Sequence, residues 1–537
     1  MMYQRTMCLS LYLILAAVAA IAPTPDAQAF CGFYVSGSNE GLYNDATQVV
    51  LMRDGKRTIL SMQNHYDGPP EDFAMVVPVP VVLKEAHVKT LPHDVFKRVD
   101  QMASPRLVEY WEQDPCYQPR PEEESDLAMA PRAAGAPPVI PEAPTSLGVK
   151  VEARFEVGEY EIVILSAKDA SGLETWLKEQ KYKIPDGAAP YFKPYIQSGS
   201  KFFVAKVNVE KVKFEKGMAM LSPLRFHYDT ETFSLPVRLG LMNAKGAQDL
   251  IVHLLGKATR YEVANYPNVT IPTNYDVAEK AKGDFGAFYA ALFDKTLEVN
   301  PKAVVTEYAW QASSCDPCPG PVVDFADLLT LGGDVMPSLS KKDASLAVDW
   351  VLTRLHARYT KENLGDDLVF RVAAPIVGGR EAMGADGKLE HGARPDCINN
   401  FQGRYAVRHP WNGPMACENP RRGVWGGPPV PAEGAIGSTP RAATNTAFAT
   451  RGTPLASYMR SAIPELKLDP QGAAPSPVGP ATPDPLRTAP PGTSGRGANG
   501  RCGCTSTGDP GSIPAGIGLG LVTLTLVRRI GRRRNGR

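Results

Sequence analysis

Residues 47–66 read TQVVLMRDGKRTILSMQNHY. Asp54 and Gly55 at the centre of this stretch form a strong turn signal. The β-rich runs on either side, Thr47–Arg53 and Arg57–Tyr66, predict the two strands of a hairpin. A third apolar run, Phe73–Val79, is closed by Pro80, and prolines at this point stop strand pairing. The folded region therefore begins as a tight antiparallel unit.

The rest of the folded region predicts more strands than helices. Apolar and polar residues alternate in Val149–Val157, which is typical of a half-buried strand. Further strands are predicted at Tyr160–Leu165, Lys201–Val209, Leu224–Tyr228, Pro236–Met242, Leu250–Leu255, Val304–Trp310, Val348–Tyr359 and Leu368–Ala373. Helices are predicted at Pro92–Met102, Arg106–Trp111, Leu173–Gln180, Ala189–Ser198, Ala278–Leu297 and Phe325–Leu331, the last stopped by Gly332 and Gly333. We expect an α+β fold with a mainly antiparallel or mixed β-sheet and a few packed helices.

Two segments have the composition of disordered linkers. Residues 118–148 are rich in Pro, Ala and Glu, and residues 427–500 are rich in Pro, Gly, Ala, Ser and Thr. Such segments bury too little apolar surface to offset the entropy lost on ordering. We therefore expect an ectodomain made of residues 30–117 and 149–426, interrupted by a disordered insertion and followed by a flexible stalk.

The first 29 residues predict a secretory signal peptide. Arg5 supplies a positive start, Leu9–Ala22 is the apolar region, and Ala27-Gln28-Ala29 is a small-x-small cleavage site. We expect cleavage after Ala29 and export of the remaining chain.

The C-terminal residues 501–537 predict a membrane tail. Cys502 and Cys504 precede the apolar run Ile513–Val527, and six arginines follow it. The run is at the short edge of a membrane span, and the arginines favour a cytoplasmic end. This order resembles the myxobacterial C-terminal sorting signal. The resemblance implies a sorting protease that acts near Cys502 or Cys504, and anchoring at the cell envelope, on its outer surface.

The charge balance argues against nucleic-acid binding. The whole chain carries a net charge of +1. Without the six arginines after Val527, and with Arg5 and Asp26 of the signal peptide cancelling, the exported part carries −5. Phosphate contacts need clustered Lys and Arg, which this part lacks.

Six cysteines belong to the folded region and are suited to disulfide bonds in an oxidising compartment. Their order along the chain suggests three pairs: Cys31 with Cys116, Cys315 with Cys318, and Cys397 with Cys417.

Three motifs resemble an uncharacterised bacterial family, the domain of unknown function 2330. They are Phe73–Pro80, Glu307–Trp310 followed by Cys315-Asp316-Pro317-Cys318, and Leu352–Tyr359 followed by Asp367–Phe370. The resemblance covers most of residues 30–379. It implies an exported bacterial protein and supplies no catalytic residues.

Cys315-Asp316-Pro317-Cys318 is the sharpest chemical motif. A redox dithiol needs a lowered thiol pKa, commonly from a helix N-terminus. Here Pro319-Gly320-Pro321 separates the motif from the next helix, and Asp316 would raise the pKa of a neighbouring thiol. A structural disulfide is therefore favoured over redox chemistry.

Other candidate sites have weaker signals. A four-cysteine zinc site would need Cys397 and Cys417 beside Cys315 and Cys318, although the second pair lacks the usual zinc spacing. His227, beside Tyr228 and Asp229, is the one local polar cluster among scattered histidines. The Arg- and Trp-rich segment Asn399–Trp425 is suited to interfaces or sugars, but also to a loop packed on the core.

The leading hypothesis is a non-enzymatic, surface-anchored ectodomain that binds an unknown envelope partner or supports envelope architecture. No metal or cofactor is expected, because hydrolase, phosphate-binding and metal motifs are missing. The first alternative is an envelope thiol-disulfide oxidoreductase that uses Cys315 and Cys318. The second is an envelope sugar-binding module.

Overall fold

The computed structural model describes residues 33–34, 47–64, 74–116, 148–180, 182, 184, 187–215, 218–243, 247–339, 344–360, 364–380, 389–428, 441–442 and 451–470. The chain divides into two units, residues 1–491 and 492–537, and all described residues belong to the first. The predicted signal peptide, Cys31, almost all of the insertion and the predicted membrane tail lie outside the described residues. Across the described ranges, no helix is both long and apolar enough to cross a membrane.

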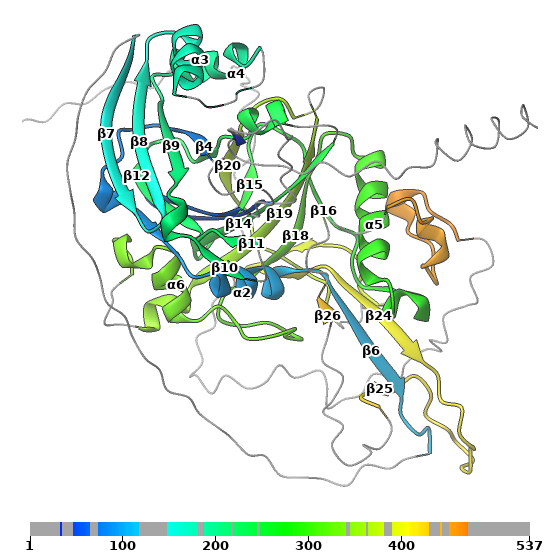
Figure 1. The fold of residues 1–537 in the computed structure, drawn as a ribbon. Coiled ribbons are helices and arrows are strands. Elements are labelled where there is room, and N and C mark those ends of the chain that lie inside the picture. Colours follow the sequence, from blue (N-terminus) through cyan, green and yellow to red (C-terminus); the bar gives the residue numbers. More distant parts are fainter. Residues whose placement is uncertain are drawn as a thin grey trace, which may run out of the picture. The chain divides into compact units, whose positions relative to one another are not determined.

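A mixed sheet forms the centre of the fold (Figure 1). Its strand order is β22-β21-β23-β18-β19-β14-β2-β3-β12-β5, and β16 pairs with β18 outside this path. The predicted hairpin is confirmed as β2 and β3, joined by a turn in which Gly55 has a φ of +56°. The strands are β2 (Thr47–Asp54), β3 (Arg57–Asn64), β5 (Val88–Thr90), β12 (Leu224–Asp229), β14 (Gln248–Lys257), β16 (Asn268–Thr270), β18 (Val304–Gln311), β19 (Trp350–Tyr359), β21 (Ile376–Gly378), β22 (Arg394–Pro395) and β23 (Asn400–Gln402).

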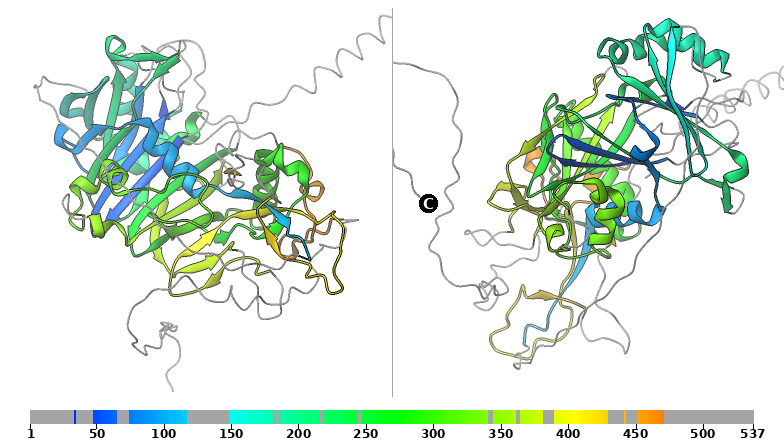
Figure 2. Two further views of the ribbon diagram at one scale, coloured as in Figure 1. Left: turned by 90° about the horizontal axis from the view of Figure 1, so that it is seen from below. Right: turned by 90° about the vertical axis from the view of Figure 1, so that its left-hand side faces the viewer.

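A second sheet packs on one face of the central sheet. Its order is β1 (Phe33–Tyr34), β4 (Ala74–Val79), β9 (Lys201–Val207), β8 (Tyr160–Ala167) and β7 (Val149–Val157). Strand alternation directs Val49 and Leu51 of β2 into the core between the sheets, where they meet Ile162 and Phe203. Helices α3 (Ala170–Glu179) and α4 (Ala189–Gln197) cover the outer face of this sheet (Figure 2).

Helices also cover the other face of the central sheet. Val50 and Met52 of β2 point to this face and pack with α2 (His93–Ala103) and α6 (Phe325–Leu331). An Asp324–Asp327 capping box starts α6, and Gly332, with a φ of +141°, ends it as predicted. A separate core surrounds α5 (Phe285–Val299) and joins it to Val305 and Ala309 of β18.

Smaller sheets complete the described structure. One has the order β13 (Ser234–Leu235), β20 (Leu368–Ala373) and β15 (Arg260–Val263). Another has the order β17 (Tyr275–Asp276), β24 (Arg404–His409), β6 (Arg106–Glu112) and β25 (Trp425–Gly426), with β26 (Arg441–Ala442) also on β6. A third pairs β10 (Lys213–Glu215) with β11 (Met218–Met220). Five α-helices and mixed sheets in these residues confirm the α+β class.

Two predicted elements are of the wrong type. Residues 106–112 form strand β6 instead of a helix, because residues 106–111 pair in parallel with β24. Residues 238–243 form a 3-10 helix, η5, instead of a strand. Pro236 lacks an N–H, and the Asp367 carboxylate accepts hydrogen bonds from the N–H groups of Val237 and Arg238, which stabilises the turn. The predicted helix 278–297 is also divided: Glu279–Lys282 is the 3-10 helix η6, and α5 starts at Phe285.

The prediction of a stalk over residues 427–500 is wrong for residues 451–470, which we call the strap. Figure 1 shows the strap in orange beside α5. It contains the 3-10 helices η10 (Leu455–Ser457) and η11 (Pro464–Leu466). Its apolar side chains are buried in the same core as α5: Leu455, Tyr458, Met459, Ile463 and Leu466. Their spacing of three and four residues is that of a helix, but Pro454 and Pro464 interrupt the segment, which forms short 3-10 turns instead.

Candidate functional site

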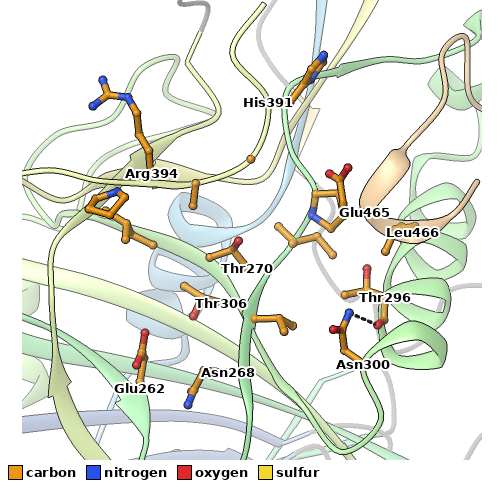
Figure 3. Close-up of a pocket in the computed structure, with 17 residues that line it drawn as sticks. Glu262, Asn268, Thr270, Thr296, Asn300, Thr306, His391, Arg394, Glu465 and Leu466 are labelled. Atoms are coloured by element: carbon orange, nitrogen blue, oxygen red, sulfur yellow. Dashed lines mark hydrogen bonds between the residues drawn. The ribbon is translucent and has the colours of Figure 1, made fainter. Parts of the chain in front are cut away.

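A cleft of about 670 Å³ lies where β16, β18, α5, residues 391–395 and the strap meet (Figure 3). Its volume falls within the range of small-molecule sites in proteins. Polar residues from these segments and from β15 line it together with apolar ones. We call this cavity the cleft.

Two threonines from neighbouring strands form the inner part of the cleft. Thr270 of β16 and Thr306 of β18 are register partners in a parallel pair, so their side chains lie on the same face. The Ile271 N–H donates to the Thr306 carbonyl at 3.0 Å and holds the two strands together. In Figure 3 both hydroxyl-bearing side chains lie between Glu262 and Glu465. The cleft thus has two hydroxyl groups on a rigid sheet.

Helix α5 and its C-cap residue add two polar side chains one turn apart. The Thr296 hydroxyl donates to the Leu292 carbonyl at 2.8 Å, and the Asn300 amide donates to the Thr296 carbonyl at 3.0 Å. These bonds fix both side chains. The Asn300 amide oxygen is an acceptor, and the Thr296 oxygen keeps lone-pair capacity.

Charged side chains of the cleft are already held by neighbours. Glu262 of β15 accepts from Arg260 at 2.8 Å and lies 3.6 Å from Arg371. Arg394 bonds to Asp396 at 2.8 Å and also pairs with Glu390.

The strap contributes a wall of the cleft. Tyr275 of β17 donates its hydroxyl to the two carboxylate oxygens of Glu465, at 2.8 and 3.0 Å. Burial, together with the bond to Glu465, raises the pKa of Tyr275 well above its usual range. His391 stacks on the Tyr275 ring with centroids 4.2 Å apart.

Ion pairs and hydrogen bonds hold the strap against the core. Arg451 pairs with Asp249 of β14 and Asp294 of α5. The Tyr458 hydroxyl donates to Asp284 at 2.8 Å, directly before α5. The main chain adds a bond of 2.7 Å from Ala278 N–H to the Tyr458 carbonyl. Together with its buried side chains, these contacts make the strap part of the fold, and they position Glu465.

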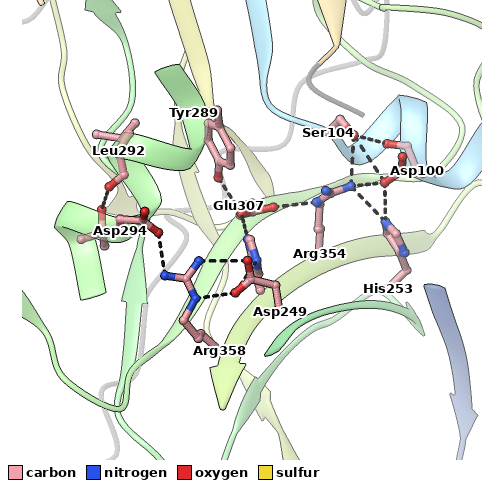
Figure 4. Close-up of polar contacts among 12 residues, drawn as sticks. Asp100, Ser104, Asp249, His253, Tyr289, Leu292, Asp294, Glu307, Arg354 and Arg358 are labelled. Atoms are coloured by element: carbon pink, nitrogen blue, oxygen red, sulfur yellow. Dashed lines mark hydrogen bonds and ion pairs between the residues drawn. The ribbon is translucent and has the colours of Figure 1, made fainter. Parts of the chain in front are cut away.

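Next to the cleft, a network of charged side chains is buried in the central sheet (Figure 4). Glu307 of β18 accepts from Arg354 at 2.6 Å and from the Tyr289 hydroxyl at 2.6 Å, and it lies 2.7 Å from His356 Nδ1. Arg354 also pairs with Asp100 of α2. The side chains of Glu307 and Arg354 are both 0% exposed.

The electrostatics of this network keep its charges fixed. Burial alone would raise the pKa of Glu307, but His356 and Arg354 outweigh it and lower that pKa to about 2. Burial would lower the pKa of Arg354, but Asp100 and Glu307 raise it. A carboxylate held in this way is a poor proton donor or acceptor near neutral pH, so the network acts in structure.

A second group continues the network along β14 and β19. Asp249 and Arg358 are register partners, joined by two bonds of 2.6 and 2.9 Å. Arg358 also bonds to Asp294 at 2.6 Å. This group therefore links the central sheet, α5 and the strap through Arg451.

The sequence did not single out these residues as a site. One signal was present: Arg354, His356 and Arg358 alternate with apolar residues in a strand, which places all three on one face. Their buried partners are distant in the sequence. No sequence pattern indicates the cleft residues Thr270, Thr306 and Glu465.

The predicted Cys315–Cys318 disulfide is present, but the other two predicted pairings are wrong. Cys116 bonds to Cys417, with Cα atoms 5.5 Å apart. β6 and β24 are parallel neighbours, so the residues that follow them reach the same edge of the sheet. Cys417 therefore meets Cys116 instead of Cys397, which lies exposed. Three of the four cysteines of the weighed zinc site are in disulfides, and no metal-binding cluster occurs in the described part of the chain.

The Cys315–Cys318 loop is anchored by side chains from distant segments. Arg106 donates to the Pro317 carbonyl at 2.6 Å, Gln101 to the Pro319 carbonyl at 2.8 Å, and Gln402 to the Asp316 carbonyl at 2.6 Å. Cys315 is half-buried and Cys318 is exposed.

The other candidate residues are in ordinary structural settings. In the Arg- and Trp-rich segment, Arg408 pairs with Asp276 at 2.9 Å and lies over the Trp425 ring, and both residues are buried. His227 packs edge-on against His87, and burial lowers its pKa to about 4. The neighbouring Asp229 bonds to Arg57 at 2.6 Å.

Fold and site together define a mixed α+β protein with a polar cleft beside a buried ion network. The sequence model of a family described as "Uncharacterized protein conserved in bacteria (DUF2330)" matches residues 25–371. The chain belongs to this family. No curated protein and no solved structure is significantly similar to it. The matched range ends before the strap, which supplies Glu465.

Proposed function

We propose that this chain is an exported envelope ectodomain that binds a small polar ligand in the cleft and catalyses no reaction. The cleft carries this proposal, because it combines a volume of about 670 Å³ with fixed hydroxyl, amide and carboxylate groups. The buried ion network gives these groups a rigid support.

Export is supported by two kinds of observation. The sequence of Met1–Ala29 has the three parts of a signal peptide. The structure also contains the Cys116–Cys417 disulfide, which joins residues 301 positions apart. Disulfides of this structural kind are typical of proteins from oxidising compartments. We propose that residues 501–537 anchor the protein in the membrane, and that a sorting protease processes the tail near Cys502 or Cys504.

Packing of the strap on the fold shortens the proposed stalk. Since residues 451–470 are packed on α5, the segment between fold and tail is 471–500 instead of 427–500. Protease added to intact cells should release a fragment that ends in this shorter segment. A fragment that is cleaved only after the cells are permeabilised would place the ectodomain in the periplasm. Replacing Cys502 and Cys504 together by Ala should block tail processing but leave membrane insertion intact.

The test of ligand binding is a blocked cleft. Ala393 is half-buried in its wall, so Ala393→Trp should fill the cavity, whereas Ala374→Trp places the same side chain at an exposed position that does not line the cleft. A library of small polar compounds would be screened by thermal shift on the full-length protein. We expect at least one compound that stabilises the wild type and Ala374→Trp but not Ala393→Trp. If every compound that stabilises the wild type stabilises both variants equally, the proposal is contradicted.

A second candidate function is thiol-disulfide exchange, which the exposure of Cys318 favours. Exchange would reduce a substrate disulfide while Cys315 and Cys318 become oxidised. Reduced wild-type protein would be assayed for insulin reduction, with Cys315→Ser as the control. Activity that Cys315→Ser abolishes would favour the oxidoreductase over the binding protein.

A further inference from the structure

We propose that the ligand of the cleft is a neutral saccharide of one or two rings, held between the Thr270–Thr306 pair and Glu465 of the strap. This inference rests on the proposed binding function and adds the chemical class of the ligand. Four features of the cleft carry it: its hydroxyl pair, its acceptors, its charge balance and its apolar lining.

The hydroxyl pair is suited to ligand hydroxyl groups. A threonine hydroxyl both donates and accepts hydrogen bonds, as does a sugar hydroxyl. Thr270 and Thr306 are register partners on adjacent strands, so two such groups lie side by side at a fixed spacing. A ligand with hydroxyls on neighbouring ring carbons can bond to both of them.

Acceptors on the walls complete the polar lining. Glu465 accepts one hydroxyl, that of Tyr275, although a carboxylate has about four lone-pair sites. Glu262 lies on another wall and Asn300 adds an amide oxygen. These groups can accept hydrogen bonds from several ligand hydroxyls at once.

The charge balance disfavours anions and offers a cation only one carboxylate without an ion pair among the described residues, that of Glu465. An anion would meet two carboxylates, and the guanidinium of Arg394 is already engaged by Glu390 and Asp396. A cation would gain little from Glu262, because Arg260 and Arg371 neutralise it. A neutral ligand meets neither obstacle.

Apolar groups in the same cleft are suited to the C–H faces of a sugar ring. Val269 and Ala393 are half-buried and Pro395 is exposed, and all three line the cavity together with the polar groups. Ligand sites usually combine such an apolar lining with a few directional polar groups. Leu466 and Glu465 both come from the strap, so the site is complete only when the strap is packed on α5.

The test compares neutral sugars of one and two rings with charged sugars of one ring. Calorimetry on the full-length protein, in a detergent without a sugar headgroup, would compare glucose, maltose and cellobiose with protonated glucosamine and with glucuronate. We expect the tightest-binding neutral sugar to bind about tenfold more tightly than glucosamine and glucuronate, a difference that binding assays resolve readily. Stronger binding of glucuronate or glucosamine, or no binding of any of the five, would overturn the assignment.

Variants locate the bound sugar. Thr306→Val removes one hydroxyl without changing shape and should weaken binding about three- to tenfold, as expected for one lost hydrogen bond. Thr330→Val on α6 is the matched control and should leave binding unchanged. Glu465→Gln should improve glucuronate binding relative to the wild type, since it removes a negative charge. Equal binding by wild type and Thr306→Val would contradict the site.

Failure of this inference can be told apart from failure of the proposed function. If Ala393→Trp abolishes the binding of a compound that is not a saccharide, the cleft is a binding site but the ligand class is wrong. If a sugar binds equally to wild type and Ala393→Trp, the sugar lies elsewhere and the cleft assignment is wrong.

Discussion

Replacing Glu307 by Gln should destabilise the protein strongly at neutral pH. Glu307 is fully buried and compensates the charges of Arg354 and His356. Glutamine keeps the size of the side chain but removes its negative charge. Arg354 would keep Asp100 as a partner and lose its second carboxylate.

The magnitude follows from the pKa. Relative to its ordinary value of 4.5, the pKa of Glu307 is lowered to about 2 in the folded protein. A shift of this size corresponds to about 3 kcal/mol of stability. Removing one partner of a buried ion pair typically costs about 3–5 kcal/mol, in agreement with this value. Because the folded-state pKa lies below the unfolded one, this stability is present above pH 4.5 and is lost as the pH falls toward 2.

The assay is guanidinium-induced unfolding at a series of pH values from neutral to acid. Glu307→Gln should unfold at a lower denaturant concentration at pH 7 and should lose less further stability below pH 4.5 than the wild type. The control is Glu298→Gln on α5, whose exposed pair with Lys295 should change stability by less than about 0.5 kcal/mol. A loss under about 1 kcal/mol for Glu307→Gln at pH 7, or an unchanged acid dependence, would refute this reasoning.

Three further predictions concern other parts of the fold. The double variant Cys116→Ser/Cys417→Ser should lose up to about 5 kcal/mol in unfolding experiments, because the disulfide closes a long loop; a loss below about 1 kcal/mol would argue against this bond. Arg451→Ala should raise hydrogen exchange of residues 451–470 about tenfold or more while the central sheet stays protected, and unchanged exchange would show that the strap does not depend on its ion pairs. His227 has a pKa lowered by burial to about 4, so its neutral form stabilises the fold above pH 6.5 and this contribution is lost toward pH 4; His227→Gln should flatten the pH dependence of stability in that window, and an unaltered profile would contradict the assignment.

The sequence predicted those elements whose local signals agree with their packing. The β2–β3 hairpin and α6 were predicted because a turn residue, a cap and a stop signal lie within the segment itself. Residues 106–111 were assigned to a helix because their strand identity depends on β24, nearly three hundred residues away. The disulfide pairing was mispredicted for the same reason. Six cysteines allow many connectivities, and only the parallel β6–β24 pair selects Cys116 with Cys417.

The candidate site was less accessible to prediction than the fold. Its polar groups come from β16, β18, α5 and the strap, and no two of these segments share a local motif. The strap itself was assigned to a stalk from its high Pro, Gly and Ala content. Composition describes the average of a segment, whereas burial of Leu455, Ile463 and Leu466 depends on the apolar face that α5 offers them.

Electron density in the cleft tests the central claim most directly. Crystals of the protein grown with the tightest ligand from the thermal-shift and calorimetric screens would be compared with crystals grown without it. We expect ligand density within hydrogen-bond distance of the Thr270 and Thr306 hydroxyls and of the Glu465 carboxylate. Ligand density at another site, with the cleft unchanged between the two crystals, would contradict it.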